Sequence, residues 1–260
     1  MKWVLVAFVL LAAMPLLAGC YQSLLATFHP FRRSDPSHDP DVLPRVAIIV
    51  PAWNEAAVVG RTIDTLMRLD YPEDRLRVYV VDDASTDETP DVVAAKAEEY
   101  PGRAFHLRRE LGGEGKAHTI NHGLRRIQED DWFQAVLVID ADVIFTERSL
   151  RRMARHLADP AIGAVTGYIK EGSRPANYMN RFIAYEYVNA QAGARRAQNV
   201  LGAQACLAGG AQLVRRDSLE AIGGVIDTST LAEDTVTTLR IQLSGRKVVF
   251  EPHAIVWAEE

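Results

Sequence analysis

The apolar residues of this chain fall into two kinds of segment, which alternate from about residue 45 to residue 159. Short β-branched runs that are typical of buried strands occupy 46–50, 76–81, 104–107 and 135–139. Segments whose apolar residues recur at helical spacing occupy 59–71, 89–102, 116–128 and 147–159. This alternation predicts an α/β fold, with a mostly parallel sheet that carries helices on both faces.

A different pattern opens the chain, because residues 3–28 are nearly all apolar. At ~1.5 Å per residue a helix of this length crosses a ~30 Å hydrocarbon core. The letters LAGC at 17–20 resemble a lipoprotein signal, which would lead to export and lipidation of Cys20. The apolar run continues past Cys20, however, and two arginines at 32–33 follow it. We therefore favour a cell-membrane anchor that leaves the rest of the chain in the cytoplasm.

Residues 29–44 are rich in Pro, Asp and Ser and are expected to form a linker, so the folded domain should occupy 45–260. The formal net charge of −5 argues against a nucleic-acid partner. The two cysteines do not suggest a disulfide framework, because Cys20 lies within the apolar segment and Cys206 far from it.

Polar groups follow each of the predicted strands. These segments are PAWNE at 51–55, DDASTD at 82–87, LGGEGKAHTIN at 111–121 and DAD at 140–142. In open α/β sheets, ligands bind just outside the carboxyl ends of the parallel strands. The convergence of four polar segments therefore predicts a ligand site at that edge of the sheet.

Asp140 and Asp142 interrupt an apolar run that spans 136–145. In extended backbone two such side chains point to the same side, with Cα atoms ~6.5 Å apart. They can then share a hard divalent cation whose other ligands are water and phosphate oxygens. The alternative is a solvated turn at the end of the strand, which the return of apolar residues at 143–145 makes less attractive.

Asp82 and Asp83 follow the second predicted strand, where a carboxylate can accept a hydrogen bond from a nucleotide base. The alternative is a turn or helix cap, but Asp87 or Thr89 can serve that purpose. Trp53, after the first strand, suits either stacking on a base or packing in the core.

Lys116 follows a glycine-rich loop and begins a predicted helix, where glycine backbone, a helix N-terminus and a cation together suit a phosphate. A surface lysine after a flexible turn is the simpler alternative. The segment is not a P-loop, because Glu110 stands where that motif requires Gly and Ala117 replaces its Ser or Thr.

Two further helical patterns carry candidate residues. Glu233 and Asp234 lie in the first turn of a predicted helix with an apolar stripe of Val236, Leu239 and Leu243; acids there also compensate a helix dipole. Upstream, a second stripe is expected to pack in the core, with a platform for sugar as the alternative; it consists of Tyr178, Phe182, Tyr185 and Val188.

Taken in order, five segments resemble the family 2 glycosyltransferases, and most of all the membrane-bound synthases of cellulose, chitin, hyaluronan and poly-N-acetylglucosamine. The segments are PAWNE, VDDASTD, GKAHTINHGL, DAD and AED. The resemblance implies a GT-A fold and transfer of a sugar, with inversion, from a nucleoside diphosphate donor that is usually UDP. The acceptor would be a glycan hydroxyl, in polysaccharide synthesis.

The same resemblance implies roles for individual residues. The uridine would be held by Pro51, Ala52, Trp53, Glu55 and Asp83, with Asp82 beside them. Lys116 would lie near the diphosphate, together with Asp140. Asp140 and Asp142 match the family's DxD and would bind Mg2+ or Mn2+. Asp234 matches the acid that acts as general base, and Glu233, Gly209 and Gly210 would lie beside the sugars.

Two departures from the family pattern stand out. Ala232 replaces the Thr of the usual TED, and the chain ends at Glu260 before any QxxRW motif, so we expect a domain truncated at its C-terminal end. The competing hypothesis is an exported lipoprotein with an inactive or sugar-binding module. A nucleotidyltransferase would need a Gly-rich, Arg-containing loop after the first strand, which 51–60 lacks.

Overall fold

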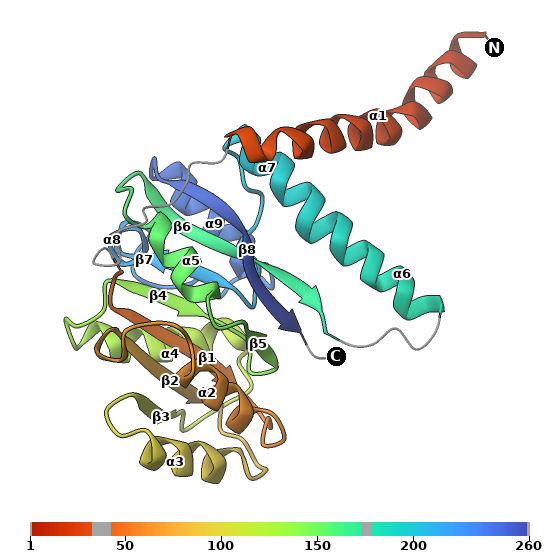
Figure 1. Ribbon diagram of the computed structural model, residues 1–260. Helices are drawn as coiled ribbons and strands as arrows, with labels where there is room; N and C mark the ends of the chain where they lie inside the picture. Colours follow the sequence, from red (N-terminus) through yellow and green to blue (C-terminus); the bar gives the residue numbers. More distant parts are fainter. Residues whose placement is uncertain (1, 33–42, 173–177, 259–260) are drawn as a thin grey trace.

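The computed structural model describes residues 2–32, 43–172 and 178–258 (Figure 1). Its strands are β1 (Val46–Ala52), β2 (Leu76–Asp82), β3 (Ala104–Arg108), β4 (Ala135–Val138), β5 (Val143–Phe145), β6 (Ile162–Glu171), β7 (Gln212–Arg215) and β8 (Lys247–Ala258). They form one sheet in the order β3-β2-β1-β4-β7-β6-β8-β5. This confirms the α/β class.

Helices cover both faces of the sheet (Figure 1). They are α1 (Lys2–Arg32), α2 (Val59–Met67), α3 (Thr89–Glu99), α4 (Lys116–Gln128), α5 (Ser149–His156), α6 (Tyr178–Tyr187), α7 (Arg195–Leu201), α8 (Arg216–Ala221) and α9 (Glu233–Leu243). A 3-10 turn, η2 (Glu73–Arg75), precedes β2, and a π-helical segment, η3 (Val188–Ala194), joins α6 to α7.

The predicted half of the sheet, β3-β2-β1-β4, is parallel throughout. Side chains of β1 alternate between two cores, as expected for a strand covered on both faces. Ile48 belongs to the core beneath α2 and α5, whereas Ile49 belongs to the core beneath α4. Burial of these β-branched and leucine-rich layers holds the carboxyl ends of the strands in fixed positions.

The other half of the sheet is mixed, and its strands were not predicted. β7 is antiparallel to both β4 and β6, β8 is parallel to β6, and β5 is antiparallel to β8. The description "mostly parallel" therefore holds only for the half that begins the domain. The segment that carries Asp234 belongs to the mixed half, because α9 leads into β8.

The run 136–145 is not one strand, which corrects the expectation of extended backbone at Asp140 and Asp142. β4 ends at Val138, a turn occupies 141–142, and β5 then pairs with β8. Val143 and Phe145 are buried because this segment joins a different strand neighbour, β8, where the half-buried Ile144 lies opposite Trp257. The two acids therefore lie in a connection between two buried strands.

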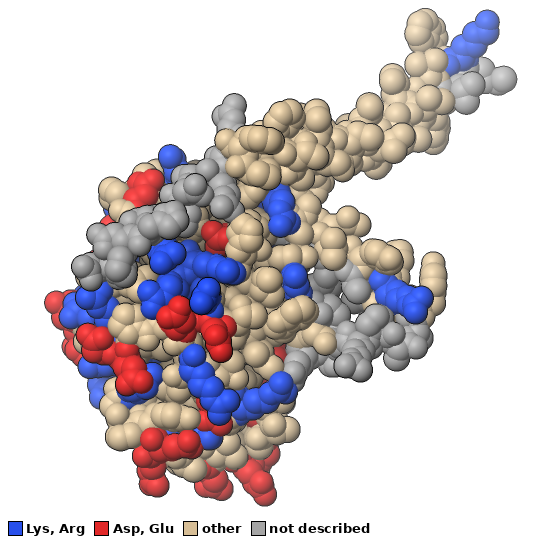
Figure 2. Space-filling view, in the orientation of Figure 1, with Lys and Arg blue, Asp and Glu red and all other residues tan. Residues whose placement is uncertain are grey.

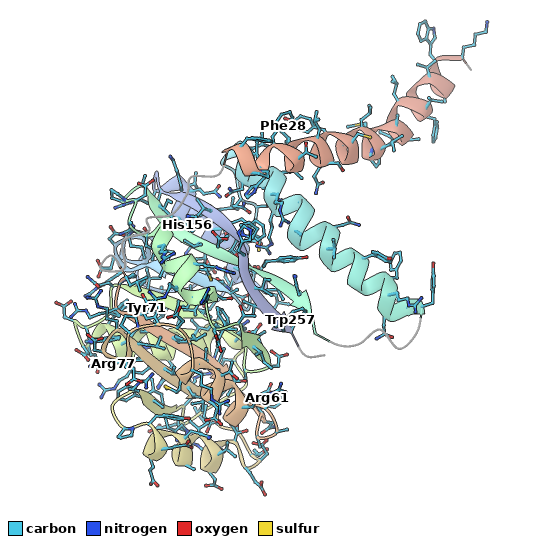
Figure 3. All side chains as sticks on the ribbon, in the orientation of Figure 1. Phe28, Arg61, Tyr71, Arg77, His156 and Trp257 are labelled. Carbon is cyan, nitrogen blue, oxygen red and sulfur yellow. The ribbon has the colours of Figure 1, made fainter. Side chains whose placement is uncertain are left out.

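Among the described residues, α1 stands out from the body of the protein and touches it only near its C-terminal end (Figures 1 and 3). Within its Lys2–Phe31 stretch the most apolar 18-residue window has a mean hydropathy of 2.4, so the helix can cross a bilayer by length and composition. The contact is made with α7 and η3. His29 is buried there, and its Nε2 lies 3.1 Å from Asn199 Nδ2. Residues 33–42, within the predicted linker, lie outside the described residues.

The predicted stripe on α6 faces outward rather than into a core, which corrects the expectation that it packs; the stripe on α9 also lies mostly at the surface, with Val236 half-buried. On α6 and the start of η3, Tyr178 is 82% exposed and Phe182 58% exposed. On α9, Leu243 is 86% exposed, whereas the buried positions are Thr237, Thr238 and Ile241. Helical periodicity identified the apolar faces correctly but not what lies against them.

Candidate active site

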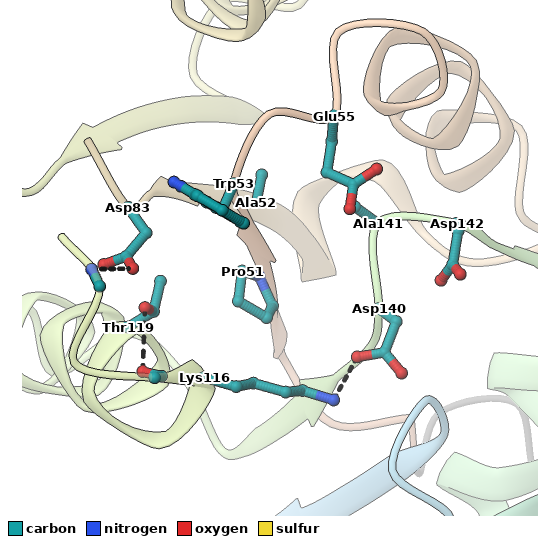
Figure 4. Close-up of a pocket in the computed structure, with 12 residues that line it drawn as sticks. Pro51, Ala52, Trp53, Glu55, Asp83, Lys116, Thr119, Asp140, Ala141 and Asp142 are labelled. Carbon is teal, nitrogen blue, oxygen red and sulfur yellow. Dashed lines mark hydrogen bonds and ion pairs between the residues drawn. The ribbon is translucent and has the colours of Figure 1, made fainter. Parts of the chain in front are cut away.

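A pocket of about 540 Å³ opens at the carboxyl ends of the parallel strands (Figure 4). The residues that line it are Pro51, Ala52, Trp53, Glu55, Asp83, Gly113, Gly115, Lys116, Thr119, Asp140, Ala141 and Asp142. The four segments that follow the predicted strands all contribute to this list. The structure thus brings together most of the residues predicted for nucleotide and metal, and adds Thr119, Ala141 and the glycine backbone.

Three carboxylates gather at one end of the pocket: Glu55, Asp140 and Asp142 (Figure 4). The pKa of Glu55 is raised, first because burial removes water from its carboxylate and then because Asp142, Asp87 and Asp140 repel its charge. Thr62 donates a 2.5 Å hydrogen bond to the carbonyl of Ala141 and fixes the turn. This end of the pocket is therefore electrostatically suited to a cation.

The carboxylate oxygens at this end of the pocket suit a divalent metal that also binds a phosphate-containing ligand. Among the described residues, no three His, Cys, Asp or Glu side chains come together as a ready-made ion cage. Asp140 and Asp142 offer hard oxygen donors and leave further positions to phosphate oxygens and water, which is how proteins commonly hold Mg2+ beside a diphosphate. Asp140 also pairs with Lys116, the first residue of α4.

Asp83 lies at the opposite end of the pocket, beside Trp53 (Figure 4). It forms a buried ion pair with Arg109, and its Oδ2 accepts a 3.0 Å hydrogen bond from the backbone of Gly113. Arg109 pairs in turn with Glu114. These contacts hold the carboxylate in one orientation. Arg109 was not predicted, and the one indication in the sequence was its place directly after the third strand.

The exposure of Trp53 decides between its two interpretations. Its side chain is 61% exposed and lines the pocket, so it does not pack in the core. The loop is held from behind by Asn54, whose φ of 56° lies in the left-handed region that Asn tolerates. Asn54 donates its backbone N–H to Ser85 and accepts from the N–H of Thr86. The loops after β1 and β2 therefore form one unit.

Asp82 does not line the pocket, which differs from the prediction for it. Its side chain is fully buried, Oδ1 accepts a 2.9 Å hydrogen bond from the N–H of Ser85, and Oδ2 lies 3.5 Å from Arg108 Nε. Neighbouring residues of an extended strand point to opposite sides, so Asp82 and Asp83 cannot both face the ligand. Asp82 therefore stabilises the turn that follows β2 rather than facing the pocket.

Gly112 allows the glycine-rich loop to lie against this turn. A Cβ at this position would be 2.0 Å from the carbonyl oxygen of Asp83, which no side chain can satisfy. Gly115, immediately before α4, has a φ of 104°, where glycine is favoured. The two glycines place Lys116 and the N-terminus of α4 at the pocket.

Asp234 reaches the same site from the mixed half of the sheet. A Cβ on Gly209 would lie 3.8 Å from Lys116 Nζ and 3.9 Å from Asp234 Oδ2, so the glycine stands between the two groups. A Cβ on Gly210 would lie 3.3 Å from Asp140 Oδ2. Both predicted glycines therefore adjoin the pocket. Glu233 is the half-buried first residue of α9.

Two buried residues that were not predicted hold the 204–210 loop, which carries these glycines. Arg195, only 8% exposed, donates to the carbonyl of Cys206 at 2.8 Å and to Thr166 Oγ1 at 3.1 Å. Thr166 Oγ1 accepts in turn from the N–H of Ala208. Burial lowers the pKa of Arg195, although Cys206 and Asp234 act to raise it.

Cys206 contacts the Asp234 region directly. Its pKa is raised to about 11, chiefly by burial, with hydrogen bonding to Thr235 acting to lower it and Asp234 acting to raise it. It is a free thiol, as is Cys20. Asp234 Oδ1 accepts a 2.7 Å hydrogen bond from the N–H of Thr235, which orients its carboxylate at the start of α9.

Comparison with known proteins gives a consistent result. Residues 44–260 match a family described as glycosyltransferase like family 2. A β-monoglucosyldiacylglycerol synthase of Synechocystis is 33% identical over 205 residues, covering 79% of this chain and 42% of that protein. The chain spans about half the length of the curated relatives it matches first.

Two solved structures have the same fold. The mannosyltransferase PcManGT of Pyrobaculum calidifontis, in complex with GDP-Man and Mn2+, has a TM-score of 0.77 and 29% identity, covering 96% of this chain and 66% of its own. TarS 1-349 of S. aureus, in complex with UDP-GlcNAc, has a TM-score of 0.60 and 17% identity, covering 83% of this chain and 58% of its own.

Proposed function

The chain belongs to glycosyltransferase like family 2, and on this premise we propose that it transfers a sugar, with inversion, from a UDP-sugar to a hydroxyl of a glycan acceptor. The single observation that carries the proposal is the pocket in which the metal-suited acids, Lys116 and Asp83 line one cavity while Asp234 adjoins it. A nucleoside diphosphate needs these groups: acceptors for a base, and cations for two phosphates.

The donor would lie along the pocket, with its base at the Asp83 end and its diphosphate at the acidic end. Trp53 and the Asp83–Arg109 pair suit the base, because one offers an exposed ring and the other a fixed acceptor. Asp140 and Asp142 would hold Mg2+ or Mn2+, which neutralises the charge that develops on a departing diphosphate. Lys116 contributes a second positive charge on the same side.

The acceptor hydroxyl would be deprotonated by Asp234. Inversion requires that the base and the leaving group lie on opposite sides of the reacting carbon, and Asp234 comes from a different half of the sheet than Asp140 and Asp142. The side-chain-free Gly209 between Lys116 and Asp234 leaves space for a sugar ring at this point. Glu233 and Gly210 would border the same sugars.

For the acceptor we propose a growing polysaccharide, from the resemblance of the five motifs to polysaccharide synthases. A lipid hydroxyl is the competing acceptor, because a relative at 33% identity is named a β-monoglucosyldiacylglycerol synthase. Transfer of radiolabelled sugar to oligosaccharide primers, compared with transfer to diacylglycerol in the same vesicles, separates the two. Product that partitions only into the lipid phase would overturn the polysaccharide assignment.

For the location we propose that α1 spans the cell membrane and that the catalytic domain faces the cytoplasm, where nucleotide sugars are made. The apolar length of α1 and the arginines at 32–33 support this orientation. A topology reporter inserted after residue 45 tests it. A reporter that is active only outside the cytoplasm would favour the exported lipoprotein instead.

The donor site is tested by calorimetric titration of the full chain with UDP in the presence of Mn2+, beside the Asp142→Ala variant. We expect the variant to lose most of its UDP affinity in Mn2+ and to match the wild type in EDTA. Equal affinity in both proteins with Mn2+ would exclude the metal site. GDP titrated in parallel decides the nucleotide, because PcManGT is seen with GDP-Man.

A further inference from the structure

α6 presents an apolar surface that nothing in the described protein covers. Its exposed large side chains follow helical spacing of three and four residues into η3, and they are Tyr178, Met179, Phe182, Tyr185 and Val188. Figure 1 shows α6 standing away from the sheet, and its contacts are confined largely to β6 and η3. We call these five residues the α6 face.

The position of the α6 face relative to α1 indicates what covers this face. α6 continues through η3 into α7, and η3 and α7 are the segments that receive the C-terminal end of α1. The two apolar helices therefore diverge from one junction (Figure 1). Figure 2 shows that the mainly uncharged surface of α1 extends onto α6, whereas acidic and basic side chains gather over the opposite part of the body.

The composition of the face matches the boundary of a bilayer rather than its centre. Its two tyrosines combine apolar area with a polar hydroxyl and are of the kind enriched at the level of lipid headgroups, while Phe182 and Met179 beside them add purely apolar area. Arg181, also exposed, lies among them and can extend to phosphate groups. A ten-residue helix is too short to cross a ~30 Å core.

We propose that the α6 face lies in the headgroup region of the same bilayer that α1 spans, and that α6 is a second, interfacial membrane contact. The inference rests on the proposed anchoring by α1. A helix in the membrane plane that continues into η3 and α7, which contact the end of the spanning helix, would fix the tilt of the catalytic domain against the lipid surface. The 204–210 loop, held by Arg195 of α7, would then face the bilayer at a constant height.

Fluorescence quenching by brominated lipids tests this position in the full chain. Phe182→Trp adds a reporter to the α6 face, and Ala94→Trp adds one to an exposed position on α3, at the far end of the molecule (Figure 1). In vesicles of phosphatidylethanolamine and phosphatidylglycerol we expect the emission added at 182 to be quenched at least about twofold more than that added at 94. Shallow bromines should act more strongly than deep ones.

Equal quenching at the two positions would overturn the proposal. So would an absence of quenching at 182 together with crosslinks between copies of a Phe182→Cys variant, because the α6 face would then pair with a second copy of this chain. Trypsin cleavage after Arg181 checks the wild type: vesicles should protect this bond, and detergent should expose it. UDP binding is measured on the same samples, so loss of nucleotide affinity is recognised separately from loss of membrane contact.

Discussion

The two halves of the sheet build their parts of the site by different means. In the parallel half, backbone hydrogen bonds between the strand ends place Asp83 and its partner Arg109: the N–H of Asp83 donates to the carbonyl of Ala52, and the N–H of Arg109 to that of Asp82, each at 2.9 Å. The side chains of Ser85 and Asn54 only add to this support. In the mixed half, side-chain hydroxyls hold the backbone: the N–H of Leu207 donates to Thr238 Oγ1 at 2.8 Å.

This difference has a functional consequence. Strand ends are fixed largely by the sheet itself, so the end of the pocket proposed for the donor is preformed. The 204–210 loop depends on a few side chains distant in sequence, so it can be altered without disturbing the donor end. We therefore expect mutations to separate into two classes, one that changes nucleotide binding and one that changes transfer at constant nucleotide affinity.

The largest effect is expected for Asp234→Asn. Loss of a positioned base lowers transfer about 10²–10⁴-fold, while UDP affinity in Mn2+ stays that of the wild type. Single-turnover transfer and calorimetry on the same preparation provide both values. A variant that also loses UDP binding would break the separation of the two halves, and one that retains full transfer would exclude Asp234 as the base.

Lys116→Gln should weaken UDP binding, which Asp234→Asn leaves unchanged. A charge-assisted hydrogen bond to a phosphate contributes about 1.5–3 kcal/mol, so UDP affinity should fall roughly 10- to 100-fold. Mn2+ affinity without nucleotide should not fall, because Asp140 loses the cation that competes for its carboxylate. Titrations of Mn2+ alone and of UDP with Mn2+ distinguish this result from a general loss of the site.

Arg195→Met tests the loop support and is expected to have a smaller effect. The loop loses its donor to the carbonyl of Cys206, and displacement of the acceptor side lowers transfer about tenfold without changing UDP affinity. Arg195→Lys retains one donor and should recover part of the rate. Thermal unfolding serves as the control, since a fall in transfer that tracks unfolding would indicate a structural defect only.

Gly209→Ala should have the smallest effect, chiefly on the acceptor. Its Cβ would meet Lys116 Nζ and Asp234 Oδ2 at ordinary contact distances of 3.8 and 3.9 Å. The substitution should therefore leave the stability of the fold unchanged and reduce the space available to the acceptor sugar. We expect a raised KM for acceptor and an unchanged melting temperature. Gly112→Ala is the matched contrast in the donor half, where the 2.0 Å clash should lower the melting temperature.

The parallel half was predictable because its elements follow local rules. The expected helix 116–128 is α4 with the same bounds, and each predicted strand appears within one or two residues. β-branched runs and helical spacing report burial directly. The order of polar segments at the strand ends was therefore enough to bring Trp53, Asp83 and Lys116 to one pocket before any contact was known.

The mixed half escaped prediction because its order comes from distant partners. β5 exists as a strand because β8 lies beside it, and nothing near Val143 signals that pairing. In the sequence, nothing distinguishes Arg195 from the other basic residues of helices. Its role depends on its hydrogen bonds to Cys206 and Thr166, which the sequence does not indicate. Periodicity likewise marked the α6 stripe as apolar but carried no information on whether protein or lipid would cover it.

One turn of α7 has a consequence for which acceptors can be used. Asn199 contacts His29 at the end of α1, and Arg195, four residues earlier, holds the loop beside Asp234. Four residues of α-helix rise only ~6 Å. If α1 spans a membrane, α7 would fix the distance between the lipid surface and the reacting hydroxyl of the acceptor, and would keep that distance short. Acceptors would then be selected by their distance from the membrane as well as by their chemistry.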